Sequence, residues 1–148
     1  MSIRTSIWLI SLIFGGLILA ACGTSATPSG FFGQQEQFEK PEPPEQFADH
    51  SNPFADDPDV IAEGEVLYQA NCSSCHGFMG EGDGTAAAGL EPKPENLAQT
   101  QSALSDAYLF WRISEGGLIQ PFNSLMPAWK GMMSEEKIWQ VVSYLRNL

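Results

Sequence analysis

The sequence predicts an all-α domain over residues 57–148, built from three main helices. Three segments carry apolar residues at helical spacing, and each follows a residue that commonly caps a helix. No segment shows the alternation of apolar and polar residues that is typical of a strand, and no internal repeat is visible. The chain has 148 residues, which is enough for one modest domain and an N-terminal extension.

The first predicted helix begins at Asp57, which can cap it, and Pro58 occupies the first helical position. One face of this helix carries Val60, Ile61, Gly64, Leu67 and Tyr68.

The second helix is predicted from Ser105 to about Glu115, because Ser105 can cap it and Gly116 and Gly117 end it. Its residues are apolar almost all round, so we expect it to be mostly buried.

The third helix is predicted from Ser134 to the C-terminus, with Glu135 and Glu136 at its positive end. Its apolar face consists of Ile138, Val141, Val142 and Leu145. Between the helices lie two long irregular stretches, residues 77–101 and 118–133. Such loops are uncommon in a compact domain unless something organises them, and a large apolar cofactor would do so.

Composition narrows the class of partner. The chain has 7 Lys and Arg against 18 Asp and Glu, a formal net charge of −11. A nucleic-acid binder needs a basic surface, and this sequence has none, so nucleic acid is excluded as a partner. Strong negative charge favours solubility and steers the protein toward basic or neutral surfaces.

Residues 1–21 are typical of a signal peptide, with one basic residue, Arg4, before an apolar run over residues 7–19. That run is short for a membrane span. It ends in Leu-Ala-Ala before Cys22, which resembles a bacterial lipobox, so we expect Cys22 to carry the lipid of a membrane anchor. The alternative is a retained transmembrane helix with an incidental Cys22. In both cases the domain stays on the membrane and faces the periplasm or another extracytoplasmic space.

Residues 22–56 are predicted to be an extended tether, because prolines and acidic residues stiffen and extend a chain. Five bulky side chains do not suit a plain tether: Phe31, Phe32, Phe38, Phe47 and Phe54. They could pack on the neighbouring domain, or they could dock in pockets of a partner protein.

The segment Cys72-Ser73-Ser74-Cys75-His76 contains the residues that could bind a cofactor. Two thiols on one turn can each add to one of the two vinyl groups of a haem, and the following imidazole can bind the iron. A zinc site needs four ligands, and the only other Cys and His are Cys22 and His50. A thioredoxin-like pair needs a βαβ context, and a disulfide would leave His76 unexplained. The segment therefore predicts covalent attachment of one haem c.

Together with four other segments, this motif makes the chain resemble the class I cytochromes c over residues 57–148. The five segments, the motif included, are Gly64-x-x-x-Tyr68, Cys72 to Gly77, Gly80-Glu81-Gly82-Asp83-Gly84, Met126-Pro127-Ala128-Trp129 and Val141 to Leu145. The resemblance implies a small cytochrome c fold, with three main helices around a covalently bound haem. It also implies that Gly64 lets the first helix approach the last near Tyr144 and Leu145.

The second axial ligand of the iron is predicted to be Met126. It lies in the middle of a loop, Pro127 fixes the backbone after it, and it matches the ligand motif of the family. Met79 follows His76 too closely to reach the opposite haem face, and Met132 and Met133 directly precede a helix and could be core. His50 lies in the tether. A core position is the usual place of a methionine, but the iron otherwise lacks a protein ligand on that side.

The surroundings of the haem are less defined by sequence. His76 Nδ1 should donate to a backbone carbonyl, and the resemblance favours Pro92 or Pro94 for that role. Arg112, Trp111 and Trp129 could meet the haem propionates, or Arg112 could be a surface residue and the tryptophans core.

A haem with two protein ligands has no open position for a substrate. We therefore expect an electron-transfer protein rather than an enzyme, with redox proteins and membrane lipid as its partners and no small-molecule substrate. It could be a shuttle or a subunit of a respiratory or photosynthetic quinol-oxidising complex, such as alternative complex III. The alternative is a haem c enzyme or gas sensor in which Met126 dissociates.

Overall fold

The computed structural model of the chain describes residues 40–148. The chain divides into residues 1–38 and residues 39–148, and the described helices belong to the second part. Residues 40–148 contain helices and no strand, which confirms the predicted all-α fold. The predictions for Cys22, Phe31, Phe32 and Phe38 fall outside the described residues.

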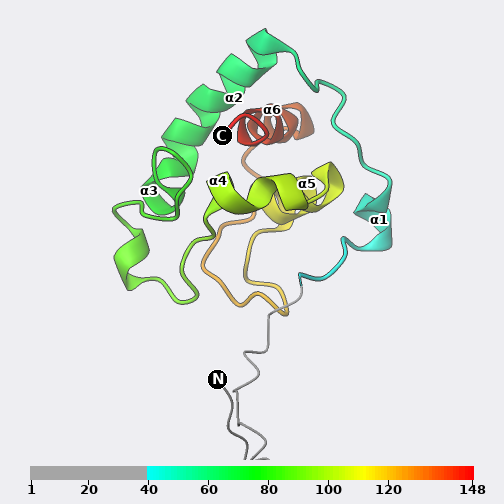
Figure 1. The fold of residues 1–148 in the computed structure, drawn as a ribbon. Coiled ribbons are helices and arrows are strands. Elements are labelled where there is room, and N and C mark those ends of the chain that lie inside the picture. The colour runs from blue at the N-terminus through cyan, green and yellow to red at the C-terminus, as the bar shows by residue number, and fades with distance from the viewer. Residues whose placement is uncertain (1–39) are drawn as a thin grey trace, which may run out of the picture. The chain divides into compact units, whose positions relative to one another are not determined.

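The three predicted main helices are all present (Figure 1). They are α2 (Pro58–Asn71), α5 (Asp106–Glu115) and α6 (Glu135–Leu145). The side chains of Asp57, Ser105 and Ser134 accept backbone hydrogen bonds at the three N-termini, as the sequence predicts. The helix α6 ends at Leu145 rather than at the C-terminus, and residues 146–148 form turns.

Five shorter helices were not predicted. They are α1 (Glu45–Ala48), α3 (Ser73–His76), α4 (Leu97–Thr100) and the 3-10 helices η1 (Ala87–Gly89) and η2 (Gln101–Ala103). Each is a single turn, which is too short to show an apolar period in the sequence. Two of them, η1 and α4, lie within the stretch that was expected to be irregular throughout.

The first and last main helices cross in close contact. A Cβ atom on Gly64 would come within 2.0 Å of the Gln140 carbonyl oxygen and 3.0 Å of Tyr144 Cβ. Only glycine permits that approach, so the close crossing implied by the resemblance is confirmed, with Gln140 as its nearest contact. The Gln140 amide also donates a hydrogen bond to the Glu63 carboxylate.

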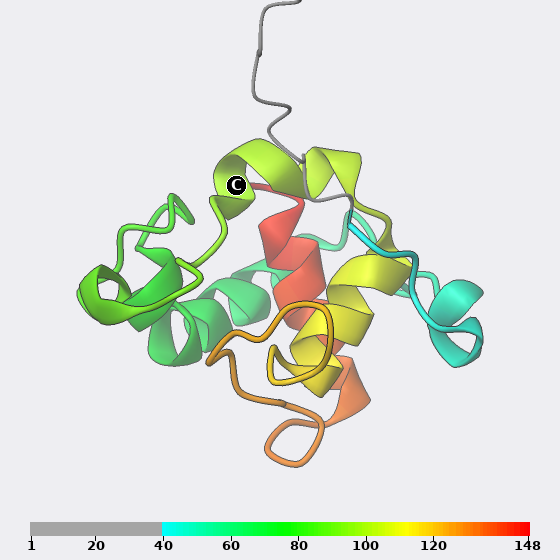
Figure 2. The ribbon, with the colours of Figure 1, turned by 90° about the horizontal axis from the view of Figure 1, so that it is seen from below.

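The second main helix is the most buried of the three. Its buried residues are Ala107, Tyr108, Leu109, Phe110, Trp111, Ile113 and Ser114, as its apolar composition predicted. The rings of Phe110 and Trp139 stack with centroids 4.3 Å apart, which joins α5 to α6. Figure 2 shows α5 and α6 beside each other, with a long yellow-to-orange connection between them.

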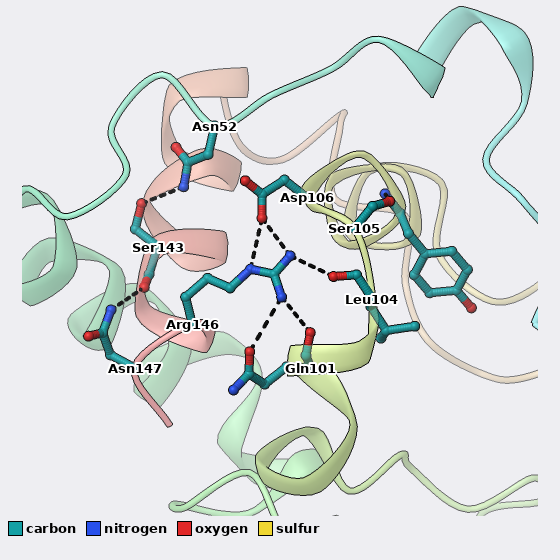
Figure 3. A network of polar contacts seen from close by, with 9 residues as sticks. Asn52, Gln101, Leu104, Ser105, Asp106, Ser143, Arg146 and Asn147 are labelled. Atoms are coloured by element: carbon teal, nitrogen blue, oxygen red, sulfur yellow. Dashed lines mark hydrogen bonds and ion pairs between the residues drawn. The ribbon is translucent and has the colours of Figure 1, made fainter.

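Arg146 ties the end of α6 to the segment that leads into α5 (Figure 3). Its guanidinium donates to the Asp106 carboxylate, to the Leu104 carbonyl oxygen at 2.7 Å and to Gln101. Since Asp106 is the first residue of α5, this network fixes the register between the two helices.

Residues 40–56 pack against the domain, and we call them the N-terminal strap. Both ribbon views place α1, within the strap, on the side of α5 opposite to α2. Phe47 and Phe54 are partly buried against the core, and Asn52 Nδ2 donates to Ser143 Oγ at 2.8 Å. Of the two alternatives, packing on the neighbouring domain or docking to a partner, the structure shows the first for Phe47 and Phe54.

Candidate haem site

The two cysteines and His76 lie on consecutive helical turns. The backbone N–H of Cys72 still donates to Tyr68 in α2, and the N–H groups of Cys75 and His76 both donate to the Cys72 carbonyl oxygen, at 3.1 and 2.9 Å. Cys72 and Cys75 are both partly buried free thiols, so the disulfide alternative is wrong. On a helical backbone two cysteines three positions apart, with Ser73 and Ser74 between them, present both sulfur atoms to one neighbouring group.

Burial sets the charge state of the first thiol. Burial, with a smaller contribution from the neighbouring Cys75, raises the pKa of Cys72 to about 12. The site therefore disfavours a thiolate at neutral pH. A thioether sulfur carries no charge, so this environment suits a covalently attached carbon group.

The His76 ring is oriented by one hydrogen bond. Its Nδ1 lies 3.1 Å from the Glu95 carbonyl oxygen, and burial lowers the pKa of the imidazole, while the Glu95 carbonyl opposes that shift. A neutral imidazole that donates through Nδ1 keeps a lone pair on Nε2, which is the form that binds a metal.

The carbonyl that meets His76 was assigned to the wrong residue by sequence. It belongs to Glu95 and not to Pro92 or Pro94. The Pro94 carbonyl oxygen instead faces Gly82, where a Cβ atom would come within 2.6 Å of it, and Pro92 is exposed. Glu95 precedes Asn96, the cap of α4, and that short helix left no signal from which the position of its carbonyl could be predicted.

A buried tyrosine holds the turn that follows His76. The hydroxyl of Tyr68 is inaccessible and donates to the Gly77 carbonyl oxygen at 2.9 Å. Burial raises the pKa of Tyr68, so this hydroxyl remains a donor. Tyr68 therefore connects α2 to the backbone directly after the histidine.

Residues 116–134 connect α5 to α6 and include Met126, and we call them the Met126 loop. This loop is docked on the end of α5. The Gly117 N–H donates to the Met126 carbonyl oxygen at 2.8 Å. Gly116 has φ +70°, and a Cβ atom there would lie 2.6 Å from the Met126 carbonyl oxygen, Pro127 C and Ala128 N. Met126 itself is partly buried against the hydrophobic core. Gly116 is thus required both for its conformation and for the approach of the loop.

The other residues that could ligate an iron lie in different surroundings. Met79 and Met132 are exposed, at 58% and 62% of their surface, and Met133 packs partly against the core. His50 lies among aromatic rings, with centroids 5.2 Å from Phe110 and 6.4 Å from Trp139. His50 is therefore part of the contact between the strap and the domain.

Arg112 is a half-buried cation near the Met126 loop. It donates to the Gly116 carbonyl oxygen, lies 3.4 Å above the centroid of the Phe122 ring and is hydrogen-bonded to Tyr108. Burial lowers the pKa of Arg112. Within residues 40–148 no carboxylate pairs with it, so it retains the capacity to bind an anionic group.

The tryptophans differ from each other. Trp111 is buried and packs edge-on against Tyr108 and Phe122, which fits a core residue. Trp129 is partly buried, and its backbone N–H donates to the Ile113 carbonyl oxygen at 3.1 Å. Contact of Arg112 or Trp129 with a propionate stays a prediction.

Together these residues fit a covalently bound haem. The chain offers two cysteine thiols on one turn, an imidazole with a free nitrogen and a thioether on a docked loop. That loop also exposes large apolar side chains, with 76% of Leu118 and 66% of Leu125 accessible, and apolar surface of this kind favours an apolar group over it. Residues 40–148 contain no group of three or more His, Cys, Asp or Glu side chains that could hold a metal ion directly.

Comparison with known proteins agrees with this geometry. The family model described as cytochrome c oxidase, cbb3-type, subunit III matches residues 59–145. Cytochrome c6 of a Synechococcus strain is 33% identical over 85 residues, which cover 57% of this chain and 67% of cytochrome c6.

Solved structures share the fold. Cytochrome cL of Methylophaga aminisulfidivorans superposes with a TM-score of 0.52 at 25% identity, over 79% of this chain and 71% of that one. The reducing HAO-like protein complex of Kuenenia stuttgartiensis gives 0.53 at 20% identity, over 76% of this chain and 52% of that one, and shows the fold alone. The chain belongs to the cytochrome c family, as a class I monohaem c-type cytochrome that carries covalently bound haem c and transfers electrons.

Proposed function

We propose that this cytochrome is an extracytoplasmic single-electron carrier, anchored to the membrane by lipid on Cys22. Cys72 and Cys75 would hold the haem covalently, and His76 and Met126 would bind its iron. The observation that carries the assignment is the hydrogen bond between His76 Nδ1 and the Glu95 carbonyl oxygen, because it directs the other ring nitrogen toward a metal.

The bound haem supplies a reversible one-electron change at its iron. The chain supplies the ligands, and a thioether opposite an imidazole raises the reduction potential. The backbone hydrogen bonds between the Met126 loop and α5 support a Met126 thioether that would stay bound to the haem iron. An occupied position excludes substrate, which supports electron transfer over the haem c enzyme or gas sensor with a labile Met126.

The membrane attachment is proposed from the sequence that ends at Cys22. Within residues 40–148 no helix is long and apolar enough to cross a bilayer. We propose that the anchored domain works as a shuttle or as a subunit of a respiratory or photosynthetic quinol-oxidising complex, such as alternative complex III.

Charge indicates the kind of redox partner. Residues 57–148 contain 12 acidic and 5 basic residues. The docking surface on the partner should therefore be basic or largely apolar. Reaction with an acidic-faced oxidase should be slow at low salt and should quicken as salt screens the repulsion.

Two measurements on the purified holoprotein test the proposal. A low-spin spectrum that carbon monoxide does not change after reduction supports the carrier, whereas carbon monoxide binding supports the sensor. Cys22→Ser should move the protein from the membrane fraction to the soluble extracytoplasmic fraction without changing the haem spectrum. A Cys22→Ser protein that stays on the membrane would show that another segment anchors it.

A further inference from the structure

The Met126 loop supplies hydrogen-bond donors to the last carbonyl oxygens of α5. The carbonyl oxygens of the last turn of a helix have no partner within the helix. Here the Ile113 carbonyl accepts the Trp129 N–H at 3.1 Å, and the Ser114 carbonyl accepts the Lys130 N–H at 3.2 Å. The loop segment from Met126 to Lys130 is therefore held against α5 by its backbone.

A salt bridge closes the same loop through side chains. Lys130 Nζ lies 2.8 Å from Glu115 Oε1 and 2.7 Å from Glu115 Oε2, so it contacts both carboxylate oxygens. The Glu115 side chain is 24% exposed and the Lys130 side chain is 59% exposed. The pair joins the last residue of α5 to the residue four positions after Met126.

The helix favours this pairing. A carboxylate in the last turn of a helix lies near the negative end of the helix dipole, which is unfavourable, whereas a cation there is favourable. Glu115 occupies that last turn and therefore needs a nearby positive charge. Lys130 supplies this charge, and its own position beside the helix end is stabilised by the same field.

We propose that Glu115 and Lys130 are positioning residues for Met126, which keep the loop closed so that the thioether remains on the iron. This inference rests on the proposed function, in which Met126 is the second axial ligand. Loss of the pair should open the loop locally without unfolding the domain, because loops with few buried contacts open at low free-energy cost.

The test measures how easily added imidazole replaces Met126 in the ferric holoprotein. Imidazole can bind only while the loop is open, so its apparent affinity reports the open fraction. A partly exposed ion pair contributes modestly, so Glu115→Gln and Lys130→Gln should each tighten imidazole binding about two- to five-fold. The effect of the double variant should be smaller than the product of the two single effects, because both substitutions remove the same interaction.

Two matched variants separate positioning from general charge effects. Lys130→Arg keeps a cation that can reach Glu115 and should restore the original imidazole affinity. Lys137→Gln removes an exposed lysine that makes no ion pair within the described residues, and it should leave the affinity unchanged. If Glu115→Gln tightens imidazole binding no more than Lys137→Gln does, the proposal is overturned.

Met126→Ala distinguishes failure of this proposal from failure of the ligand assignment. That variant should bind imidazole much more tightly than either pair variant. If Met126→Ala binds imidazole as weakly as the original protein, Met126 is not the ligand and the proposed function fails with it. If Met126→Ala binds tightly but Glu115→Gln is unchanged, only the positioning role is wrong.

Discussion

The two segments that face the haem site are built from different kinds of contact. Around His76 the backbone is closed by the residues that follow it: the Gly82 N–H donates to the His76 carbonyl at 2.7 Å, and the Gly84 N–H donates to the Cys75 carbonyl at 3.2 Å. The more distant partner, the Glu95 carbonyl oxygen, meets the His76 ring. Around Met126 the hydrogen bonds join the loop to the end of α5, as between Ile113 and Trp129, and to Gly117 just after it.

This difference predicts which of the two segments opens first when the protein is destabilised. The His76 turn continues α2 directly, so it needs little tertiary structure to form, and the cysteines tie it to the haem. The Met126 loop is held only where α5 is already packed, because its backbone partners lie at the end of that helix. The Met126 side should therefore open first under denaturant or heat, before the His76 turn and the main helices.

The largest effect should come from the His76 side. Cys72→Ala or His76→Ala should abolish normal haem incorporation and leave the domain largely unfolded, because a domain of this size has too little core without the haem. Haem staining and far-ultraviolet circular dichroism measure both effects. A folded, helical apoprotein would contradict the prediction.

A smaller effect is expected from a substitution of Met126, the proposed second ligand of the iron. Met126→Ala should keep the haem attached but lower the reduction potential and admit carbon monoxide to the reduced protein. Potentiometry and visible spectra measure these changes. Met132→Ala, at an exposed methionine of the same connection, and Met133→Ala are the controls, and either one reproducing the effect would show that Met126 is the wrong ligand.

A substitution at Gly116, which contacts the backbone around Met126, should have an effect of intermediate size. Gly116→Ala puts a Cβ atom 2.6 Å from three backbone atoms of the loop at a residue with φ +70°. It should destabilise the loop by about 2 kcal/mol or more, so that the spectrum of Met126 ligation is lost at lower denaturant than the helical signal.

The matched control for that variant lies in the same connection. Gly131→Ala adds the same methyl group where nothing lies within 4 Å, so it should leave the denaturation of the loop unchanged. Equal effects of the two substitutions would mean that the tight contact at Gly116 does not hold the loop.

The smallest effect is expected at Glu95. Its hydrogen bond with His76 is made by the backbone carbonyl, whereas its carboxylate forms an ion pair with Lys40 at 3.0 Å on the surface. Glu95→Gln should therefore leave the haem spectrum, the reduction potential and the affinity for imidazole unchanged, whereas Glu115→Gln on the Met126 side should tighten imidazole binding. A change in potential as large as that of Met126→Ala would show that the Glu95 carboxylate itself tunes the site.

The main helices could be predicted because their signals are local. Asp57, Ser105 and Ser134 each precede an apolar pattern longer than two turns, and each caps the helix that follows. The single-turn helices and the carbonyl of Glu95 could not be predicted, because they depend on how distant segments pack. No sequence pattern distinguishes the Glu95 carbonyl from that of Pro94.

The tether was the least predictable region. Its prolines and acidic residues resemble those of a solvated linker, yet Phe47 and Phe54 pack against the core. Replacing all five phenylalanines would therefore damage the domain as well as any docking to a partner. Serine at Phe31, Phe32 and Phe38 alone is the fair test of partner docking: release from a complex in mild detergent supports it, and stoichiometric co-purification contradicts it.

The N-terminal strap also changes how far this cytochrome can travel. Under the proposed lipid anchor on Cys22, a strap that stays on the domain reduces the stretch of chain between the lipid and the domain from residues 23–56 to residues 23–39. At ~3.5 Å per residue, that shortens the greatest possible span from roughly 120 Å to roughly 60 Å. A leash of half the length confines the haem to a smaller volume above the bilayer. It raises the local concentration of any membrane-bound partner within reach, and it puts acceptors farther out beyond reach altogether.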